Sequence, residues 1–160
     1  GNASLTKDFR TGSLGLSFSR SVSTSGGVGG TSISNTLSLT GKKDFTRHTG
    51  GSLNTFFSTR ESISGNEVDN EECGLILGVD HQISRRLSSA LSGSFIRQNS
   101  DGWGEGDTDS YRARANVSYL IRPNCSAYCS YSYYQQNGRD STEEDYENNI
   151  VTLGIKITWF

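Results

Sequence analysis

Hydrophobic and polar residues alternate along most of this chain. In residues 151–159 an apolar side chain stands at every odd position, and a small or polar residue stands at every even position. A period of two predicts a β-strand with one apolar and one polar face, because successive side chains of a strand point to opposite sides. The same alternation, with a break at Phe56, recurs in residues 13–22, 33–40, 52–60, 72–80, 87–95, 111–121 and 125–133.

The connections between these stretches alternate in kind. One set is short and basic and comprises residues 6–11, 42–49, 84–86 and 122–124. The other set is longer, glycine-rich and mostly acidic, and comprises residues 23–32, 64–72, 99–109 and 137–147. This regular alternation predicts that successive strands pair as antiparallel hairpins, with a basic end and an acidic end.

The start of the chain carries an internal repeat. Residues 5–14 match residues 39–53 apart from insertions, so Phe9 and Phe45 hold corresponding positions in two short turns. Residues 1–6 therefore read as the end of an upstream strand that enters the first short turn. We expect residues 1–160 to form a single domain, with eight strands within 12–160.

Composition narrows the class of protein. Of the 160 residues 32% are hydrophobic, and the mean hydropathy is −0.54. Low hydrophobicity often indicates disorder, but the ordered alternation and an aromatic share of 10% argue against it. A net charge of −2 gives no reason to expect a nucleic-acid partner. We also expect no cofactor.

The cysteines give no sign of a metal site or a disulfide. Cys73, Cys125 and Cys129 fit no metal-binding spacing, and all fall on the apolar face. Cys125 and Cys129 lie too far apart along one strand to be bridged. They are interpreted as small hydrophobic residues.

No helical pattern is present that would cover the apolar faces. A soluble β-sandwich would bury them between two sheets, but it rarely has Ser, Gly and Thr opposite every apolar row. A transmembrane barrel requires that arrangement, because one face meets lipid and the other meets water, and it has short turns at one end and long loops at the other. The sequence predicts an all-β, antiparallel, up-and-down transmembrane β-barrel of at least eight strands.

Residues 77–95, 117–133 and 151–160 resemble the strand and turn units of bacterial outer-membrane β-barrels. The nearest resemblance is to the group associated with exopolysaccharide and PEP-CTERM systems. It implies a place in the bacterial outer membrane, contact with lipid, lipopolysaccharide and other envelope proteins, and insertion by the barrel-assembly machinery. The end of the chain is similar to the signal that this machinery reads. Trp159 continues the apolar row, whereas Phe160 is one step out of phase.

The polar face bears on the width of the barrel. The interior of an eight-stranded barrel is filled by side chains, and a face of mostly Ser, Gly, Thr and Ala would leave it underfilled. This favours a wider, water-filled barrel of which the chain is the C-terminal part. The alternative is a complete eight-stranded barrel, because both ends of residues 10–160 fall on the short-turn side.

Charged residues on the polar face are the candidate pore-lining residues. They are Arg60, Asp80, Arg112, Arg114 and Lys156, with Glu72 as a further carboxylate. Their net positive charge predicts a lumen that prefers anions, since rings of basic side chains set the selectivity of pores. The alternative is that these residues form ion pairs that brace the wall.

Two further kinds of site have weaker support. One long connection offers oxygen ligands for calcium, although their spacing fits no EF-hand. These are Asp101, Glu105, Asp107 and Asp109. Neither His48 nor His81 has an evident serine and carboxylate partner, and a catalytic triad is recognised by geometry. We therefore expect no enzyme activity.

Two functions are compatible with these features. The first is an outer-membrane channel or porin for a polar solute or an exported polysaccharide. The second is a non-conducting structural or adhesion barrel whose acidic loops bind partners. In both cases the longer connections are expected at the cell surface and the short turns in the periplasm. Representative residues are Gly27, Asn66, Asp101 and Asp140 for the surface, and Asp44, Arg85 and Pro123 for the periplasm.

Overall fold

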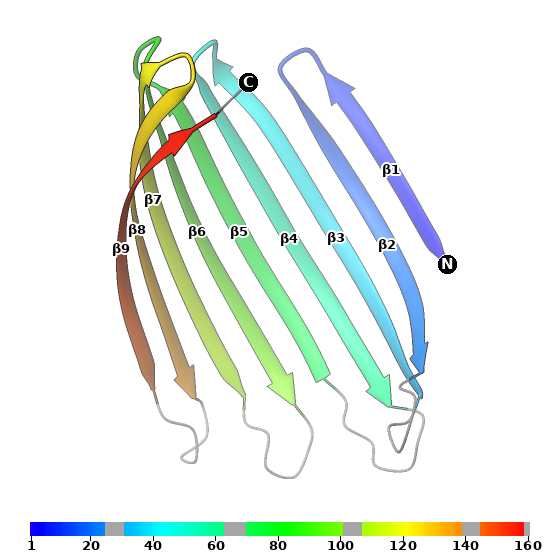
Figure 1. The fold of residues 1–160 in the computed structure, drawn as a ribbon. Helices are drawn as coiled ribbons and strands as arrows, with labels where there is room; N and C mark the ends of the chain where they lie inside the picture. Colours follow the sequence, from blue (N-terminus) through cyan, green and yellow to red (C-terminus); the bar gives the residue numbers. More distant parts are fainter. Residues whose placement is uncertain (25–30, 63–69, 101–106, 139–144, 159–160) are drawn as a thin grey trace.

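The computed structural model describes residues 1–24, 31–62, 70–100, 107–138 and 145–158. These ranges form one nine-stranded antiparallel sheet, in which each strand pairs with its neighbour in the sequence (Figure 1). The strands are β1 (Asn2–Phe9), β2 (Gly12–Thr24), β3 (Thr31–Thr46), β4 (Thr49–Ser62), β5 (Asn70–Gln82), β6 (Leu87–Ser100), β7 (Thr108–Arg122), β8 (Cys125–Gly138) and β9 (Tyr146–Ile157). The predicted all-β, up-and-down architecture is confirmed.

The first residues of the chain form a strand of the sheet. β1 pairs with β2 along its whole length, with Leu5 opposite Leu16 and Phe9 opposite Gly12. The strand expected to end at residue 6 therefore continues to Phe9, and the turn into β2 is only Arg10 and Thr11. The described sheet has nine strands because β1 precedes the eight expected ones.

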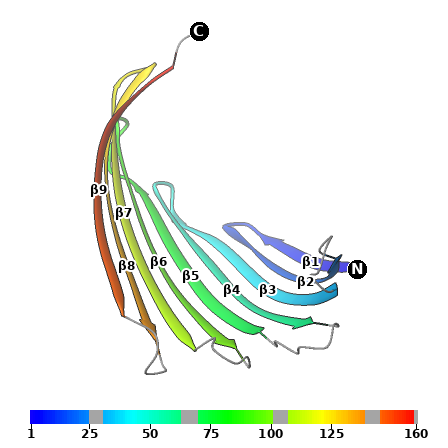
Figure 2. The same cartoon turned by 60° about the horizontal axis from the view of Figure 1, so that its bottom comes forward.

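The sheet curves into an open arc. β1 and β9 lie at its two lateral edges, and the rotated view shows the bend between them (Figures 1 and 2). No pairing joins these two strands within the described residues. An open arc of up-and-down strands fits part of a barrel rather than a flat sheet.

Several residues that were expected in short connections belong to strands. The segment 42–49 was expected to be a connection, but β3 runs to Thr46 and β4 begins at Thr49. The pairing of β3 with β4 shifts register between Asp44 and Thr46. A bulge lets a strand bend at the rim of a barrel without ending its ladder. The expectation was wrong here because basic residues on a strand end resemble a turn in sequence.

Among the described residues, no hydrophobic side chain is buried in a core. The most exposed large ones include Leu153 at 75%, Leu5 at 72% and Val151 at 67%. A soluble sandwich would have enclosed such side chains between two sheets, as its stability depends on burying them. Their exposure agrees with a sheet whose apolar face meets lipid.

Across the described ranges, the structure contains no helix with the length and apolarity needed to cross a membrane.

The registers define two continuous faces. The face that carries Leu16 is called the apolar face. Leu16 lies opposite Leu5 on β1 and Leu39 on β3. The polar face is the opposite one, on which Ser17 lies opposite Ser38. Since directly opposite residues point to the same side of a sheet, each face can be followed from strand to strand.

Crowding between strands identifies the concave face. On the polar face, a Cβ at Gly15 would lie 2.8 Å from Thr40 Oγ1, and one at Gly78 would lie 2.6 Å from Ser52 Oγ. On the apolar face, a Cβ at Gly41 or Gly93 would have its nearest neighbour at 3.8 or 3.9 Å. Only at the short-turn rim, at Gly12 and Gly51, would a Cβ come closer, to the Lys42 carbonyl oxygen and to the Phe45 ring, the latter at 2.5 Å. Side chains of neighbouring strands converge on the inside of a curved sheet and diverge on the outside. The polar face therefore lies on the hollow side.

Candidate functional site

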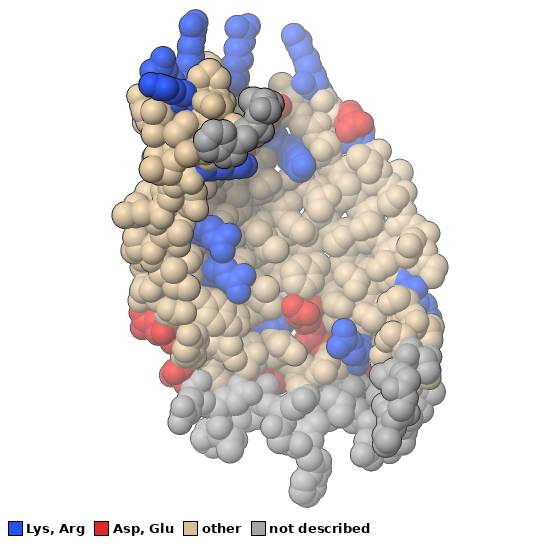
Figure 3. Space-filling view, viewed as in Figure 1, with Lys and Arg blue, Asp and Glu red and all other residues tan. Residues whose placement is uncertain are grey.

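The hollowed side of the sheet carries scattered charged side chains among uncharged ones (Figure 3). The sheet registers place all five candidate pore-lining residues on the polar face. Arg60, Asp80, Arg112, Arg114 and Lys156 lie opposite Asn70, Gly50, Ser94, Ser92 and Ser126, respectively. They do not form one cluster. Asp80 and Lys156 lie near the short-turn end, Arg60 near the other end, and the two β7 arginines between them.

Arg112 and Arg114 form the basic part of this wall. The guanidinium carbon of Arg112 lies 5.2 Å from the centroid of the Tyr134 ring on β8, within the range of a cation–π contact. The Tyr134 hydroxyl donates a hydrogen bond of 2.7 Å to Gln136 Oε1, which helps to fix the ring. Within the described residues, neither arginine has a carboxylate partner. Their charges are therefore not neutralised by the wall around them.

The acidic part of the wall lies near the short turns. The two carboxylate oxygens of Asp80 lie 2.9 and 3.0 Å from where a Cβ on Gly50 would stand. Asp80 also borders a small polar cavity of about 180 Å³ with Ser88 and Asn116. The buried Oδ1 of Asn116 accepts no hydrogen bond from the described residues. A larger side chain at position 50 would displace the Asp80 carboxylate.

Most of the polar face is a ladder of hydroxyl groups. Ser17 and Ser38 are joined at 2.7 Å between their Oγ atoms, and Ser23 and Ser32 at 2.9 Å. Thr36 Oγ1 and Ser58 Oγ lie 3.0 Å apart in the same way. These short side chains bond across the strands rather than reaching outward. They leave the space in front of the sheet open to water.

The polar face also holds large residues that the alternation did not lead us to expect there. The Phe56 ring covers Gly74 on the neighbouring strand, and the Tyr128 ring covers Gly154. Phe56 was noted as a break in the pattern, and its side chain is accommodated because its neighbour has none. A glycine directly opposite an aromatic residue is the signal that would have revealed this packing. It becomes visible only once the register is known.

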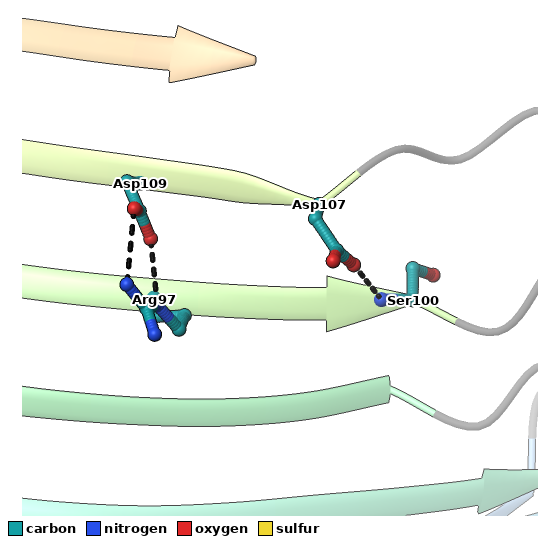
Figure 4. Close-up of polar contacts among 4 residues, drawn as sticks. All are labelled: Arg97, Ser100, Asp107 and Asp109. Carbon is teal, nitrogen blue, oxygen red and sulfur yellow. Dashed lines mark hydrogen bonds and ion pairs between the residues drawn. The ribbon is translucent and has the colours of Figure 1, made fainter. Parts of the chain in front are cut away.

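An ion pair lies on the other face, at the end away from the short turns. Arg97 on β6 donates to both carboxylate oxygens of Asp109 on β7, from Nε to Oδ1 at 2.9 Å and from Nη2 to Oδ2 at 3.2 Å (Figure 4). Such a two-point pair is among the stronger charge-assisted contacts. Arg97 was not singled out from the sequence, and Asp109 was a candidate calcium ligand. Its carboxylate is instead bound to an arginine.

The other three candidate calcium ligands are Asp101, Glu105 and Asp107. Asp101 and Glu105 lie outside the described residues. Asp107 accepts a hydrogen bond of 3.3 Å from the Ser100 backbone N–H (Figure 4). No group of three or more metal-ligating side chains occurs in the described part of the chain.

The histidines form no triad in the described structure. His81 Nδ1 and Thr49 Oγ1 lie 2.8 Å apart on the apolar face. Asp80, its neighbour in the chain, points to the opposite face, so it cannot orient the His81 ring. The proposed assembly residues, Trp159 and Phe160, lie outside the described residues.

The three cysteines are all unpaired, and each lies on the apolar face. Cys129 lies opposite Leu153, and Cys73 lies opposite Phe57 and Arg97. The absence of a bridge among them agrees with the spacing argument.

Comparison with solved structures supports the fold. The chain is similar to OmpT, an outer membrane protein of Vibrio cholerae, folded in vitro, with a TM-score of 0.78 and 11% identity over 98% of this chain and 54% of that one. OmpT of Vibrio cholerae expressed in the outer membrane matches with a TM-score of 0.74 and 12% identity, over 98% of this chain and 55% of that one. The variant of this OmpT that lacks loop L8 matches with a TM-score of 0.76 and 12% identity, over 98% of this chain and 52% of that one. The chain spans about half the length of these structures.

Sequence comparisons identify the family. No curated protein matches the chain. A family model described as "Putative beta-barrel porin 2" matches residues 58–159, which is more than half of the chain. Together with the exposed apolar face and the up-and-down sheet, this match locates the chain in the bacterial outer membrane. The chain belongs to the family of β-barrel porins that this model defines.

Proposed function

We propose that the chain forms part of the wall of a water-filled channel that conducts polar solutes with a modest preference for anions. The observation that carries the proposal is the pair Arg112 and Arg114 on the concave face. Both lack a carboxylate partner in the described sheet. Arg114 lies between Ser92 and Ser132, and Arg112 lies between Ser94 and Tyr134. The alternative in which these two arginines brace the wall through ion pairs has no support from the described contacts.

The charge on this face acts through water. A positive wall raises the concentration of anions within about one Debye length, roughly 8 Å at physiological ionic strength. The short hydroxyl side chains beside the arginines leave that layer accessible. Lys42, Arg60 and Lys156 add positive charge towards the two ends of this face, and the carboxylates on the same face subtract from it: Asp8, Asp44, Glu72 and Asp80. The preference is therefore modest, because the opposing charges share one face.

The solute class follows from the same chemistry. A lumen of hydroxyl and basic groups suits a hydrated polar or anionic solute, and an exported polysaccharide is one candidate. The proposed role of this wall is the passage of solutes through the lumen. Lipopolysaccharide, the barrel-assembly machinery and other envelope proteins are the partners that this role requires.

The test is the reversal potential of single channels in a planar bilayer under a potassium chloride gradient. Arg112→Ser with Arg114→Ser should shift the reversal potential towards the cation side without loss of folding. The matched control is Lys7→Ser with Arg20→Ser, which removes two positive charges from the apolar face. This control should leave the reversal potential unchanged.

Two results would count against the proposal. A folded protein that never conducts would favour the alternative, a non-conducting structural or adhesion barrel. A channel whose reversal potential is the same in both double variants would remove these arginines from ion selection.

A further inference from the structure

The apolar face contains a groove at the short-turn end of β1 to β5. Its volume is about 720 Å³, within the range of about 300–1,000 Å³ that is typical of small-molecule sites. Its walls are aromatic and aliphatic: Phe9, Leu14, Phe45, Leu53, Leu77 and Val79. A hollow of this size is unexpected on a surface where side chains diverge into lipid.

Missing side chains explain the groove. Gly12, Gly41 and Gly51 lie on the apolar face of three adjacent strands, where the other positions carry bulky residues. At Gly51 a Cβ would lie 2.5 Å from the Phe45 ring, so that ring already occupies the space. At Gly41 a Cβ would make ordinary contacts of 3.8 Å with Leu14 and Leu53. The groove is therefore open at Gly41 although a side chain would fit there.

Lys43 lines the groove, and Lys7 lies on the same face on the neighbouring strand β1, beyond the lining residues. Lys43 lies opposite Gly12 and Gly51, and Lys7 lies opposite Leu14 with its ammonium 5.4 Å from the Phe9 ring centroid. The neighbouring carboxylates, Asp8 and Asp44, point to the polar face, because adjacent residues of a strand alternate in direction. Within the described residues neither lysine has an ion pair.

The position of the lysines matches the boundary of a bilayer. Lys7, Phe9, Lys43 and Phe45 all lie close to the short turns, where the strands leave the membrane. Aromatic and long basic side chains favour this level, since their apolar parts contact acyl chains and their polar ends reach the head groups. A negative group at this level would be attracted by these basic side chains.

We propose that the groove binds one phospholipid of the membrane leaflet at the short-turn end. One acyl chain fills the hollow over Gly41, and the phosphate meets Lys43 and Lys7. In a bilayer an apolar wall alone gives no preference over any other lipid contact, because lipid tails are as apolar as leucine. Selectivity for one lipid must come from the fit of its acyl chain to the hollow and from the charge of its head group. The proposal rests on the membrane location of the sheet and not on conduction.

The experiment is native mass spectrometry of the purified protein in detergent, titrated separately with phosphatidylglycerol and phosphatidylcholine. We expect one phosphatidylglycerol retained per chain, in preference to phosphatidylcholine. Gly41→Leu should lower the affinity by roughly tenfold or more by filling the hollow. The matched control is Gly93→Leu, also on the apolar face but outside the groove. There the nearest atom to a Cβ is the Arg112 carbonyl oxygen at 3.9 Å, so this change should leave binding intact.

The charge is tested by a second variant. Lys7→Ser with Lys43→Ser should abolish the preference for phosphatidylglycerol while phosphatidylcholine binding persists, since surface lysines attract anionic head groups. Circular dichroism of each variant establishes that it is folded.

Three results would overturn the proposal. One is that no lipid is retained by the parent protein, and another is an equal loss of binding in Gly41→Leu and Gly93→Leu. The third is a dimer that Gly41→Leu disrupts, which would assign the groove to a second copy of the chain. Gly41 lies on the face away from the lumen, so each result leaves the channel proposal to be judged by conductance alone.

Discussion

At the scale of single residues, what matters is which face each side chain occupies. Leu153 on β9 is 75% exposed in the described structure, and it lies on the apolar face, which meets lipid. Thr152, its neighbour in the chain, lies opposite Ser130 on the polar face. The two positions are at nearly the same depth along the strand. They differ only in whether lipid or the interior of the arc lies in front of them.

This pair gives a direct test of the faces. Leu153→Arg should destabilise the folded protein by about 2–4 kcal/mol if the site lies near the bilayer midplane, because the charge would enter hydrocarbon. Thr152→Arg should cost much less, since its side chain would reach water. Unfolding by denaturant in lipid vesicles measures both. Equal destabilisation of the two variants would show that the faces are assigned wrongly.

The sequence did not predict how the large residues of the polar face are packed. Alternation correctly assigned Ser17, Arg112 and Lys156 to this face. The alternation did not explain Phe56, because nothing in the neighbouring sequence accounts for a single aromatic residue that is out of phase. The explanation is Gly74 on the next strand, because this glycine has no side chain and leaves room for the Phe56 ring. Such compensation between strands depends on register, which no local pattern contains.

At the scale of elements, β3 continues towards the short turn beyond its last aliphatic residue, Leu39. β3 contains Lys42, Lys43 and Asp44 before it ends at Thr46. Strand ends at the membrane boundary carry charged residues, because charged side chains are solvated at that level. The sequence therefore shows where a strand crosses the apolar layer, while backbone pairing decides where it stops.

The two ends of the strands should also differ in accessibility to protease. The strand ends that flank residues 25–30, 63–69, 101–106 and 139–144 lie at one end of the sheet, and the short turns lie at the other. Protease added to intact cells should cut the first set only, since the longer loops of such barrels face outward. Cleavage near Asp44, Arg85 or Pro123 in unbroken cells, mapped by mass spectrometry, would reverse the proposed orientation.

At the scale of the whole molecule, the open edges of the arc are the dominant feature. The outer edges of β1 and β9 have no strand partner in the described sheet. Backbone N–H and C=O groups cannot stay unpaired in hydrocarbon, so membrane-spanning sheets close into barrels. The sheet spans about half the length of the OmpT structures that share its fold. An open sheet of nine strands fits part of a barrel.

The proposed water-filled lumen makes a prediction about salt. If the anion preference arises from the electrostatic field of the wall, it should weaken as the Debye length falls from about 8 Å at 0.15 M to about 3 Å at 1 M salt. Reversal potentials measured in gradients at low and high ionic strength test this. A preference that is independent of salt would instead indicate a narrow site that contacts the ion directly.

The sequence by itself determined the strands, their antiparallel order and the face on which most side chains lie. It could do so because the period of two is a local property of a strand, and lipid and water impose opposite demands on its two sides. The tertiary structure alone decided which residues of different strands meet. The contact of Arg112 with Tyr134, the pair of Arg97 with Asp109 and the groove over Gly41 all depend on register and curvature. Both are set by the pairing of whole strands, so the pattern within any one strand cannot reveal them.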